Sequence, residues 1–228
     1  MAIKSMSDTA SSFGEFNLFR DFIEESCGIA LGENKQYLVN SRIKRILLDH
    51  DIVSLNTLVG RLRSGDRQLK ELVVDAMTTN ETFWFRDNYP YDYLKNTILP
   101  HLNQSAERGE ICIWSAACSS GQEPHSISMI AQEYRQRNVS VVRPLKIIAT
   151  DLSSTVLKQA RSGMYDRLSV LRGLSKDRLN LFFTEESKNN WQVKPEISQC
   201  IDFRPLNLMD NYYNLGLGFT SEVHNLNG

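Results

Sequence analysis

The feature that most constrains the fold is an alternation of short apolar segments with helical segments in the second half of the chain. Three strand candidates are separated by stretches whose apolar residues recur every three to four positions: ICIWSAA (111–117), LKIIATD (145–151) and IDFRPLN (201–207). Strands that alternate with helices are joined by right-handed crossovers into a parallel sheet. We therefore predict an α/β domain over residues 109–228, with a short hairpin within 186–198 that leads into the third strand.

The first half of the chain has a different periodicity. Apolar residues at helical spacing, such as Phe16 and Phe19, predict a small all-α domain over residues 13–76. The polar, serine-rich residues 1–12 are expected to form a disordered tail. Residues 77–108 are interpreted as a linker that contains one helix, around Tyr89 to Leu99.

Composition excludes several classes of protein. With 26 Lys and Arg against 27 Asp and Glu, the net charge of -1 gives no general attraction to nucleic acid. The four cysteines have no CxxC or Cys/His ligand spacing, so we expect reduced thiols and no metal site. Neither a signal peptide nor an apolar run of the roughly 20 residues needed to span a bilayer is visible. We therefore expect a cytoplasmic protein without membrane insertion.

The first strand leads into a loop of small residues, AACSSG (116–121). In a parallel sheet such a loop lets the backbone approach a ligand closely. A dinucleotide fingerprint would use three glycines there, but only Gly121 is present, and Glu123 would oppose a diphosphate. Glu123 would suit a cation such as an amino group or a sulfonium. The alternative is a plain tight turn with Glu123 in the favourable first turn of a helix.

An acid closes the second strand. Asp151 stands where a carboxylate accepts hydrogen bonds from ribose hydroxyls in nucleotide-binding sheets. The alternative is that Asp151 begins the DLSS sequence as the N-cap of the next helix. Both roles are compatible with one another.

The segment MTTNETFWFRD (77–87) combines many polar groups with three aromatic rings. Arg86 offers a guanidinium fork that suits a carboxylate. A helix start with core aromatics is the alternative. Upstream, the helix NKQYLVNSRIKRILLDH (34–50) turns Arg42 and Arg45 outward, either as a solvated face or as a docking surface.

At these residues the sequence resembles the CheR family, the chemotaxis-receptor glutamate methyltransferases that use S-adenosylmethionine. The similarity rests on MTTNETFWFRD, IWSAACSSGQEPHSISM, ATDLSSTVLKQARSGMYDRLS and FRPLNLMD, in the family's order. The resemblance implies a small all-α N-terminal domain followed by a Rossmann-like class I methyltransferase domain. It also implies methyl transfer to receptor glutamates, which yields glutamyl methyl esters and S-adenosylhomocysteine.

The resemblance assigns roles to individual residues. Asn80, Thr82 and Arg86 would reach the methionine portion of the cofactor, Glu123 its charged end and Asp151 its ribose, with Asn207 and Leu208 at its adenine. Arg42 and Arg45 would lie on a surface that docks on the cytoplasmic domains of the receptors. No catalytic residue is implied, because a carboxylate and a sulfonium methyl react when they are positioned in line.

The end of the sequence departs from the family pattern. After NLMDNYYNLGLGF the chain reads TSEVHNLNG (220–228), where the family continues with an apolar strand. We therefore expect an incomplete, C-terminally shortened sheet in which the first strand lies at an edge. The intact protein is expected to be a monomer. The alternative functions are a shortened relative that only docks on receptors or binds the cofactor weakly, and a methyltransferase that acts on nucleic acid.

Overall fold

A computed structural model describes residues 2–105, 109–138, 142–211 and 213–215, with side chains from Phe13 onward except for residue 214. The chain divides into two units. The first comprises the chain up to Thr79 with Leu152–Ser154 and Asn207–Asn211, and the second comprises Asn80–Asp151 and Thr155–Leu206. The segment TSEVHNLNG, on which the expected shortening was based, lies outside the described residues.

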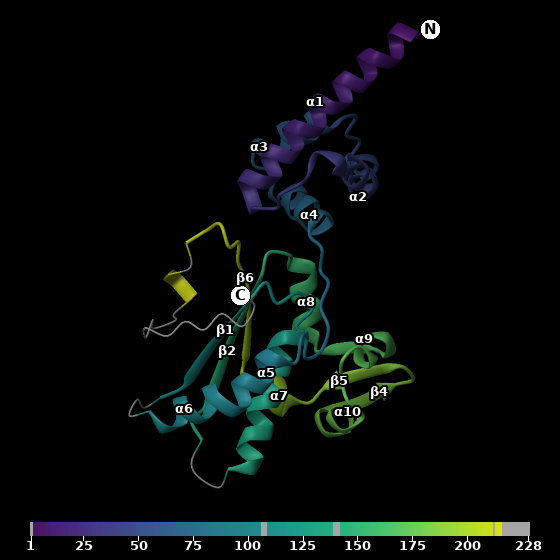
Figure 1. Ribbon diagram of the computed structural model, residues 1–228. Coiled ribbons are helices and arrows are strands. Elements are labelled where there is room, and N and C mark those ends of the chain that lie inside the picture. Colours follow the sequence, from purple (N-terminus) through teal and green to yellow (C-terminus); the bar gives the residue numbers. More distant parts are fainter. Residues whose placement is uncertain (1, 106–108, 139–141, 212, 216–228) are drawn as a thin grey trace. The chain divides into compact units, whose positions relative to one another are not determined.

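The first unit is helical (Figure 1). Its elements are α1 (Ala2–Cys27), η1 (Glu33–Lys35), α2 (Gln36–Asp49), α3 (Leu55–Arg63) and α4 (Arg67–Met77). Ser54 and Asp66 cap α3 and α4 by accepting hydrogen bonds from the backbone N–H groups of Thr57 and Leu69. Apolar side chains of the four α-helices form one core, among them Phe16, Phe19, Ile43, Leu58 and Val73.

The structure differs from the expected disordered tail at residues 1–12. Helix α1 begins at Ala2 and continues without interruption to Cys27. The first glycine of the chain is Gly14, and no proline occurs before it, so no residue of the segment breaks a helix. Serine-rich composition was therefore a poor guide to the backbone of this segment.

The second unit contains the remaining helices and both sheets (Figure 1). Its helical elements are α5 (Tyr89–Tyr93), the π-helical turn η2 (Leu94–Ile98), α6 (Leu99–Gln104), α7 (Gln122–Arg137), α8 (Ser154–Ser162), α9 (Arg167–Leu171), α10 (Lys176–Phe182), α11 (Pro195–Ser198) and η3 (Tyr213–Leu215). Helix α8 begins in the part of the chain that groups with the first unit. Its strands are β1 (Ile111–Ala116), β2 (Leu145–Asp151), β3 (Met164–Asp166), β4 (Phe183–Ser187), β5 (Asn190–Val193) and β6 (Ile201–Pro205).

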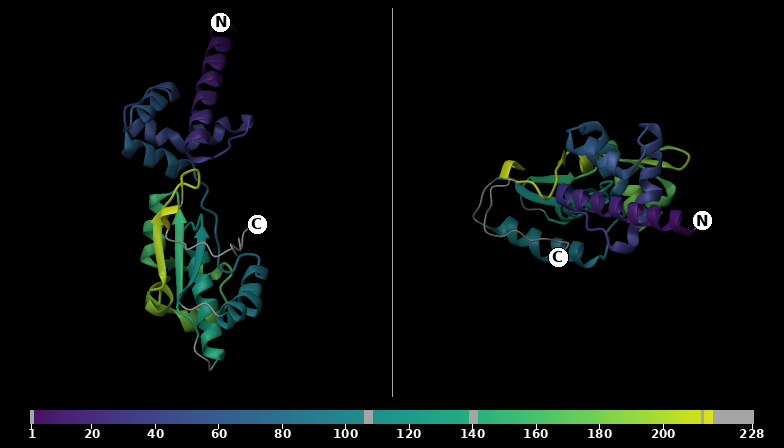
Figure 2. Two further views of the ribbon diagram at one scale, coloured as in Figure 1. Left: turned by 90° about the vertical axis from the view of Figure 1, so that its left-hand side faces the viewer. Right: turned by 90° about the horizontal axis from the view of Figure 1, so that it is seen from above.

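The larger sheet has the order β1-β2-β6, and its strands run parallel. The left view of Figure 2 shows these strands side by side. The register pairs Ile113 with Ile147 and Ile147 with Ile201, so these side chains share one face of the sheet. They belong to the core that includes Ile127 and Met129 of α7. All three predicted strands and the parallel α/β fold are confirmed.

Strand β1 lies at one edge of this sheet, since within the described ranges it pairs with β2 alone. A smaller antiparallel sheet has the order β3-β5-β4. Strands β4 and β5 form the hairpin that was expected within 186–198, although its first strand begins earlier, at Phe183.

Candidate functional site at the carboxyl edge of the sheet

The carboxyl ends of β1 and β2 bring the small-residue loop and Asp151 together. Asp151 is buried, and its Oδ2 accepts a hydrogen bond of 2.8 Å from the backbone N–H of Ser119. The backbone N–H of Cys118 donates to the carbonyl of Thr150 at 2.8 Å. The loop is thus fixed to the end of β2 by its own backbone. Ligands of open parallel sheets bind at this edge.

The loop backbone enters the left-handed region three times, twice at residues other than glycine. Ala117, Ser119 and Gly121 all adopt the left-handed region, with φ of 57°, 51° and 90°. A Cβ at Gly121 would lie 2.9 Å from the Cβ of Ala160 and 3.0 Å from the hydroxyl of Tyr165. Gly121 is therefore required by its φ and by close packing against α8 and β3. Non-glycine residues held in such conformations cluster at binding and active sites.

Two buried side chains contact the backbone carbonyls of the loop. The hydroxyl of Tyr165 donates to the carbonyl of Ser120 at 2.7 Å. The Nδ1 of His125 lies 2.7 Å from the carbonyl of Gly121 and 3.2 Å from the Tyr165 hydroxyl. Both side chains are almost completely buried, so His125 is a core histidine. They hold the carbonyls of the loop toward the protein interior.

Glu123 lies in the first turn of α7 and is partly buried. Its Oε1 accepts a hydrogen bond of 2.6 Å from the hydroxyl of Ser115 on β1. Burial raises the pKa of the nearby Tyr91 hydroxyl, and the negative charge of Glu123 raises that pKa further. A carboxylate held in this way beside the loop can face a bound cation. Glu123 also lies in the first turn of a helix, where a negative charge is favourable, so the alternative of a plain tight turn remains compatible with the structure.

The segment after α4 passes over the same loop. The backbone carbonyl of Asn80 accepts a hydrogen bond of 3.3 Å from the Ser119 hydroxyl. Trp84 and Phe85 are core residues, and the N–H of Phe85 donates to the hydroxyl of Ser126 on α7 at 3.3 Å. Helix α5 begins only at Tyr89, so the aromatic residues precede the helix instead of starting it. The side chain of Asn80 is exposed, that of Thr82 is partly buried and that of Arg86 is exposed.

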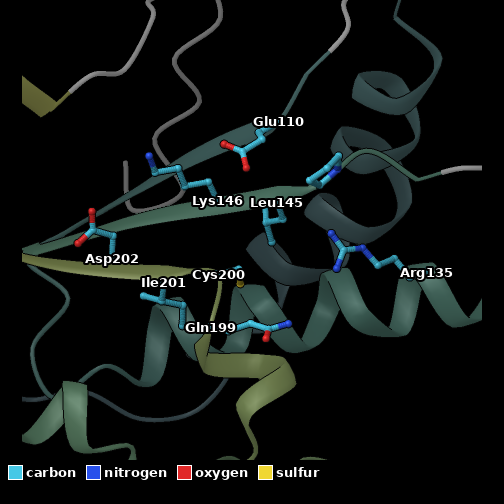
Figure 3. Close-up of a pocket in the computed structure, with 9 residues that line it drawn as sticks. Glu110, Arg135, Leu145, Lys146, Gln199, Cys200, Ile201 and Asp202 are labelled. Atoms are coloured by element: carbon cyan, nitrogen blue, oxygen red, sulfur yellow. The ribbon is translucent and has the colours of Figure 1, made fainter.

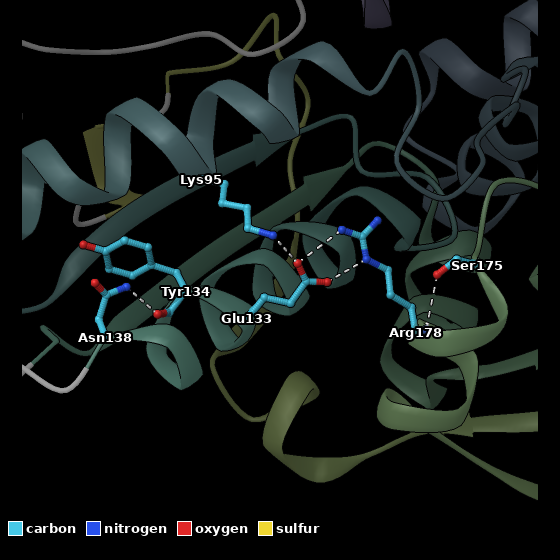
Figure 4. A network of polar contacts seen from close by, with 6 residues as sticks. All are labelled: Lys95, Glu133, Tyr134, Asn138, Ser175 and Arg178. Carbon is cyan, nitrogen blue, oxygen red and sulfur yellow. Dashed lines mark hydrogen bonds and ion pairs between the residues drawn. The ribbon is translucent and has the colours of Figure 1, made fainter.

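A partly buried ionic network joins η2 and α10 to α7 beside this segment (Figure 4). Glu133 of α7 accepts hydrogen bonds of 2.7 Å from both Lys95 and Arg178. Burial alone would raise the pKa of Glu133, but the hydrogen bonds from Arg178 and Lys95 hold this pKa below its usual value. The guanidinium carbon of Arg178 lies 3.8 Å from the centroid of the Phe85 ring, a cation–π contact. The network thereby orients Phe85, the residue that precedes Arg86.

The two residues expected at the adenine belong to the first, helical unit. Asn207 and Leu208 lie in the segment Asn207–Asn211, which groups with the helical unit. The Nδ2 of Asn207 donates to the carbonyl of Ser26 at 2.7 Å. The side chain of Leu208 is half exposed. The five other predicted cofactor residues all lie in the second unit.

The two arginines expected on the docking surface differ in their environment. Arg42 Nη1 donates to the carbonyls of Met77 and Thr78 at 2.8 and 3.3 Å, and its Nη2 donates to the Thr79 hydroxyl at 3.0 Å. Arg45 is almost fully exposed and makes an ion pair of 3.3 Å with Asp49. Periodicity placed both residues outward, but the long Arg42 side chain reaches back to the end of α4.

These contacts predict different effects of two alanine variants on stability. The variant Arg42→Ala is expected to lower the free energy of unfolding by about 1–3 kcal/mol, because charged hydrogen bonds to the end of α4 are lost. Arg45→Ala should change it by less than about 0.5 kcal/mol, because an exposed ion pair contributes little. Urea unfolding of both variants measures the difference. Equal, small changes would show that Arg42 does not fix the end of α4.

A surface pocket of about 450 Å³ lies at the amino ends of the strands of the larger sheet, away from the loop that follows β1 (Figure 3). Charged side chains of both signs line it, namely Glu110, Arg135, Lys146 and Asp202. None of the predicted site residues belongs to this lining. Because ligands of parallel sheets bind beyond the carboxyl ends of the strands, this pocket is not the candidate site.

Comparison with known proteins decides the family. Residues 14–78 match the family model described as CheR methyltransferase, all-alpha domain, and residues 80–217 match CheR methyltransferase, SAM binding domain. The chain belongs to the CheR methyltransferase family. It is 48% identical over 203 residues to chemotaxis protein methyltransferase 1 of Pseudomonas aeruginosa, a match that covers 89% of this chain and 74% of the relative.

Two further CheR relatives have similar coverage. Chemotaxis protein methyltransferase Cher2 of Pseudomonas putida is 48% identical over 204 residues, which cover 89% of this chain and 74% of the relative. A chemotaxis protein methyltransferase of Vibrio parahaemolyticus is 43% identical over 203 residues, which cover 89% of this chain and 73% of the relative. The resemblance seen in the sequence motifs is thus confirmed, and the chain is an S-adenosylmethionine-dependent methyltransferase by family.

The residues at the carboxyl edge fit this cofactor. S-adenosylmethionine carries a positive charge and no phosphate, and the structure places two carboxylates, Glu123 and Asp151, beside the loop that follows β1. A diphosphate would be repelled at the same place. Within the described ranges, no cluster of three or more His, Cys, Asp or Glu side chains could hold a metal ion. The helices in those ranges are also too short or too polar to cross a membrane.

Proposed function

We propose that this chain transfers the methyl group of S-adenosylmethionine to glutamate side chains on the cytoplasmic domains of chemotaxis receptors. The products are glutamyl methyl esters and S-adenosylhomocysteine. Relatives named chemotaxis protein methyltransferases support the receptor as substrate. The observation that carries the proposal is the anchored loop at the carboxyl edge, with Asp151 bound to Ser119 and Glu123 bound to Ser115. The cytoplasm is the compartment in which this substrate and the cofactor meet.

The cofactor supplies an activated methyl group on a sulfonium when it is bound. Asp151 would accept the ribose hydroxyls, and Glu123 would face the charged end of the cofactor. Asn80, Thr82 and Arg86 would hold its methionine portion. The work of the protein is to orient these groups, because a glutamate carboxylate is ionised and nucleophilic at neutral pH. A catalytic acid or base is therefore not part of the proposal.

The exposed part of α2 is the proposed docking surface for the receptor. Arg45 points into solvent, whereas Arg42 serves chiefly to hold the end of α4. Lys44 and Arg45 are neighbours on α2, and both are exposed. These two cations can attract an acidic receptor segment, so Arg45 remains in the proposed surface. We propose that the protein acts on the receptor as a monomer.

Methyl transfer to receptor-containing membranes tests the proposal. The chain is incubated with S-adenosylmethionine labelled on the methyl group, and the membranes are then treated with mild alkali. We expect label in the receptor that alkali releases as methanol, because a glutamyl ester is hydrolysed. Label that resists alkali would exclude a glutamyl ester product. Receptor binding without any transfer would favour the alternative in which the chain only docks.

A further inference from the structure

Two arginines flank one aromatic ring next to the candidate site. The guanidinium carbon of Arg86 lies 5.7 Å from the centroid of the Phe83 ring, and that of Arg172 lies 5.0 Å from the same centroid. Both distances are in the range of cation–π contacts. Arg172 follows α9, far from Arg86 in the sequence. It is therefore a second cation beside the segment that is proposed to hold the cofactor.

The end of α9 is locked to this segment by backbone contacts. The N–H of Trp84 donates to the carbonyl of Arg172 at 3.2 Å, and the indole N–H donates to the carbonyl of Ser169 at 3.1 Å. Gly173 adopts a φ of +96°, and a Cβ there would collide with the carbonyl oxygen of Trp84. Trp84, the residue next to Phe83, thus fixes the backbone at Arg172.

Helix α9 exposes apolar side chains at this place. Leu168 is 80% exposed and Leu171 is 63% exposed, whereas Val170 is buried. Leu168 and Leu171 are three residues apart, so they share one face of the helix, and Arg172 adjoins the same face. A single exposed leucine needs no explanation, but two on one short helix, between Arg167 and Arg172, form an apolar surface with a basic border. We define the α9 patch as Phe83, Arg167, Leu168, Leu171 and Arg172.

We propose that the α9 patch binds the receptor segment around the target glutamate. This inference rests on the proposed function. The proposed occupant is an acidic, amphipathic segment, in which glutamates supply the charge and the opposite face is apolar. Arg167 and Arg172 complement the charge, while Leu168 and Leu171 complement the apolar face. Arg172 and Arg86 both contact the ring of Phe83. The receptor segment on the α9 patch would therefore lie next to the proposed cofactor residues.

The test uses the full chain with two variants of the patch. Arg172→Glu reverses one charge, and Leu168→Ser combined with Leu171→Ser removes the apolar surface. Arg137→Glu is the matched control, because this exposed arginine lies in the last turn of α7, away from the carboxyl edge. Initial rates of methyl transfer are measured as a function of receptor concentration. Calorimetry with S-adenosylhomocysteine is run in parallel to monitor the cofactor site.

We expect the KM for receptor to rise at least about tenfold in both patch variants, while the affinity for S-adenosylhomocysteine changes less than about twofold. The control should keep the KM of the wild type. If the wild type labels the receptor and the patch variants have an unchanged KM, the inference is overturned. Loss of binding to anionic phospholipid vesicles with an unchanged KM would assign the patch to a membrane and overturn it too. If the wild type transfers no label, the proposed function itself fails.

Discussion

Replacement of Asp151 by asparagine is expected to weaken the binding of S-adenosylhomocysteine by about 100-fold, equivalent to about 2.7 kcal/mol. The carboxylate is proposed to accept both ribose hydroxyls, and hydrogen bonds to a charged acceptor contribute more than those to a neutral amide. An asparagine side chain can still accept the N–H of Ser119, so the loop should keep its position. Titration calorimetry measures the change in affinity.

The control for this experiment is Asp202→Asn. Asp202 lies on β6 near the amino ends of the strands, where it pairs with Arg204, and no cofactor group is proposed to reach it. The control should bind S-adenosylhomocysteine as tightly as the wild type. If Asp151→Asn also retains wild-type affinity, with an unchanged melting temperature, Asp151 does not contact the cofactor.

His125 is expected to make the protein lose stability as the pH falls. Complete burial lowers the pKa of His125 to about 4, although its hydrogen bond to Gly121 acts in the opposite direction. In the unfolded chain a histidine titrates near pH 6.5. Above that pH the ring is neutral in both states, so it contributes no pH dependence. Between about pH 6.5 and 4 the unfolded state binds the proton more strongly, and stability falls by up to about 3 kcal/mol.

The comparison of His125→Leu with the wild type isolates this effect. Urea unfolding at about pH 7.5 and pH 4.5 should show that the wild type loses about 2–3 kcal/mol more than the variant. The other titrating groups are common to both proteins, so they cancel in the difference. Parallel pH dependences of the two proteins would mean that His125 can be protonated in the folded state.

The strands could be predicted because each is a short apolar run between polar segments. β1, β2 and β6 begin at the predicted residues, since their burial on the core side requires Ile or Leu at fixed positions. The helical character of residues 2–12 was missed because composition says little about a backbone without helix breakers. The grouping of Asn207–Asn211 with the helical unit joins segments far apart in sequence, so local patterns could not indicate it.

The candidate site was predictable only where a residue ends or follows a strand. Glu123 could be proposed from its place after β1, and Asp151 from its place at the end of β2. Tyr165 and His125 support the loop, but the sequence separates Tyr165 from Ser120 by 45 residues and has no signal for the contact. The contacts of Arg42 were missed for the same reason, since Met77 lies 35 residues away. Helical periodicity gives the direction of a Cα–Cβ bond, and a long arginine side chain can still reach back to the protein.

Mass spectrometry of receptor peptides tests the central claim most directly. Receptor-containing membranes are incubated with the chain and with S-adenosylmethionine that carries a deuterated methyl group, and the labelled residue is located by fragmentation. The account predicts the deuterated methyl group on glutamate side chains of the cytoplasmic domain, and roughly 100-fold less label when Asp151→Asn replaces the wild type at a low cofactor concentration. Label on a residue other than glutamate, or on nucleic acid instead of the receptor, would contradict it.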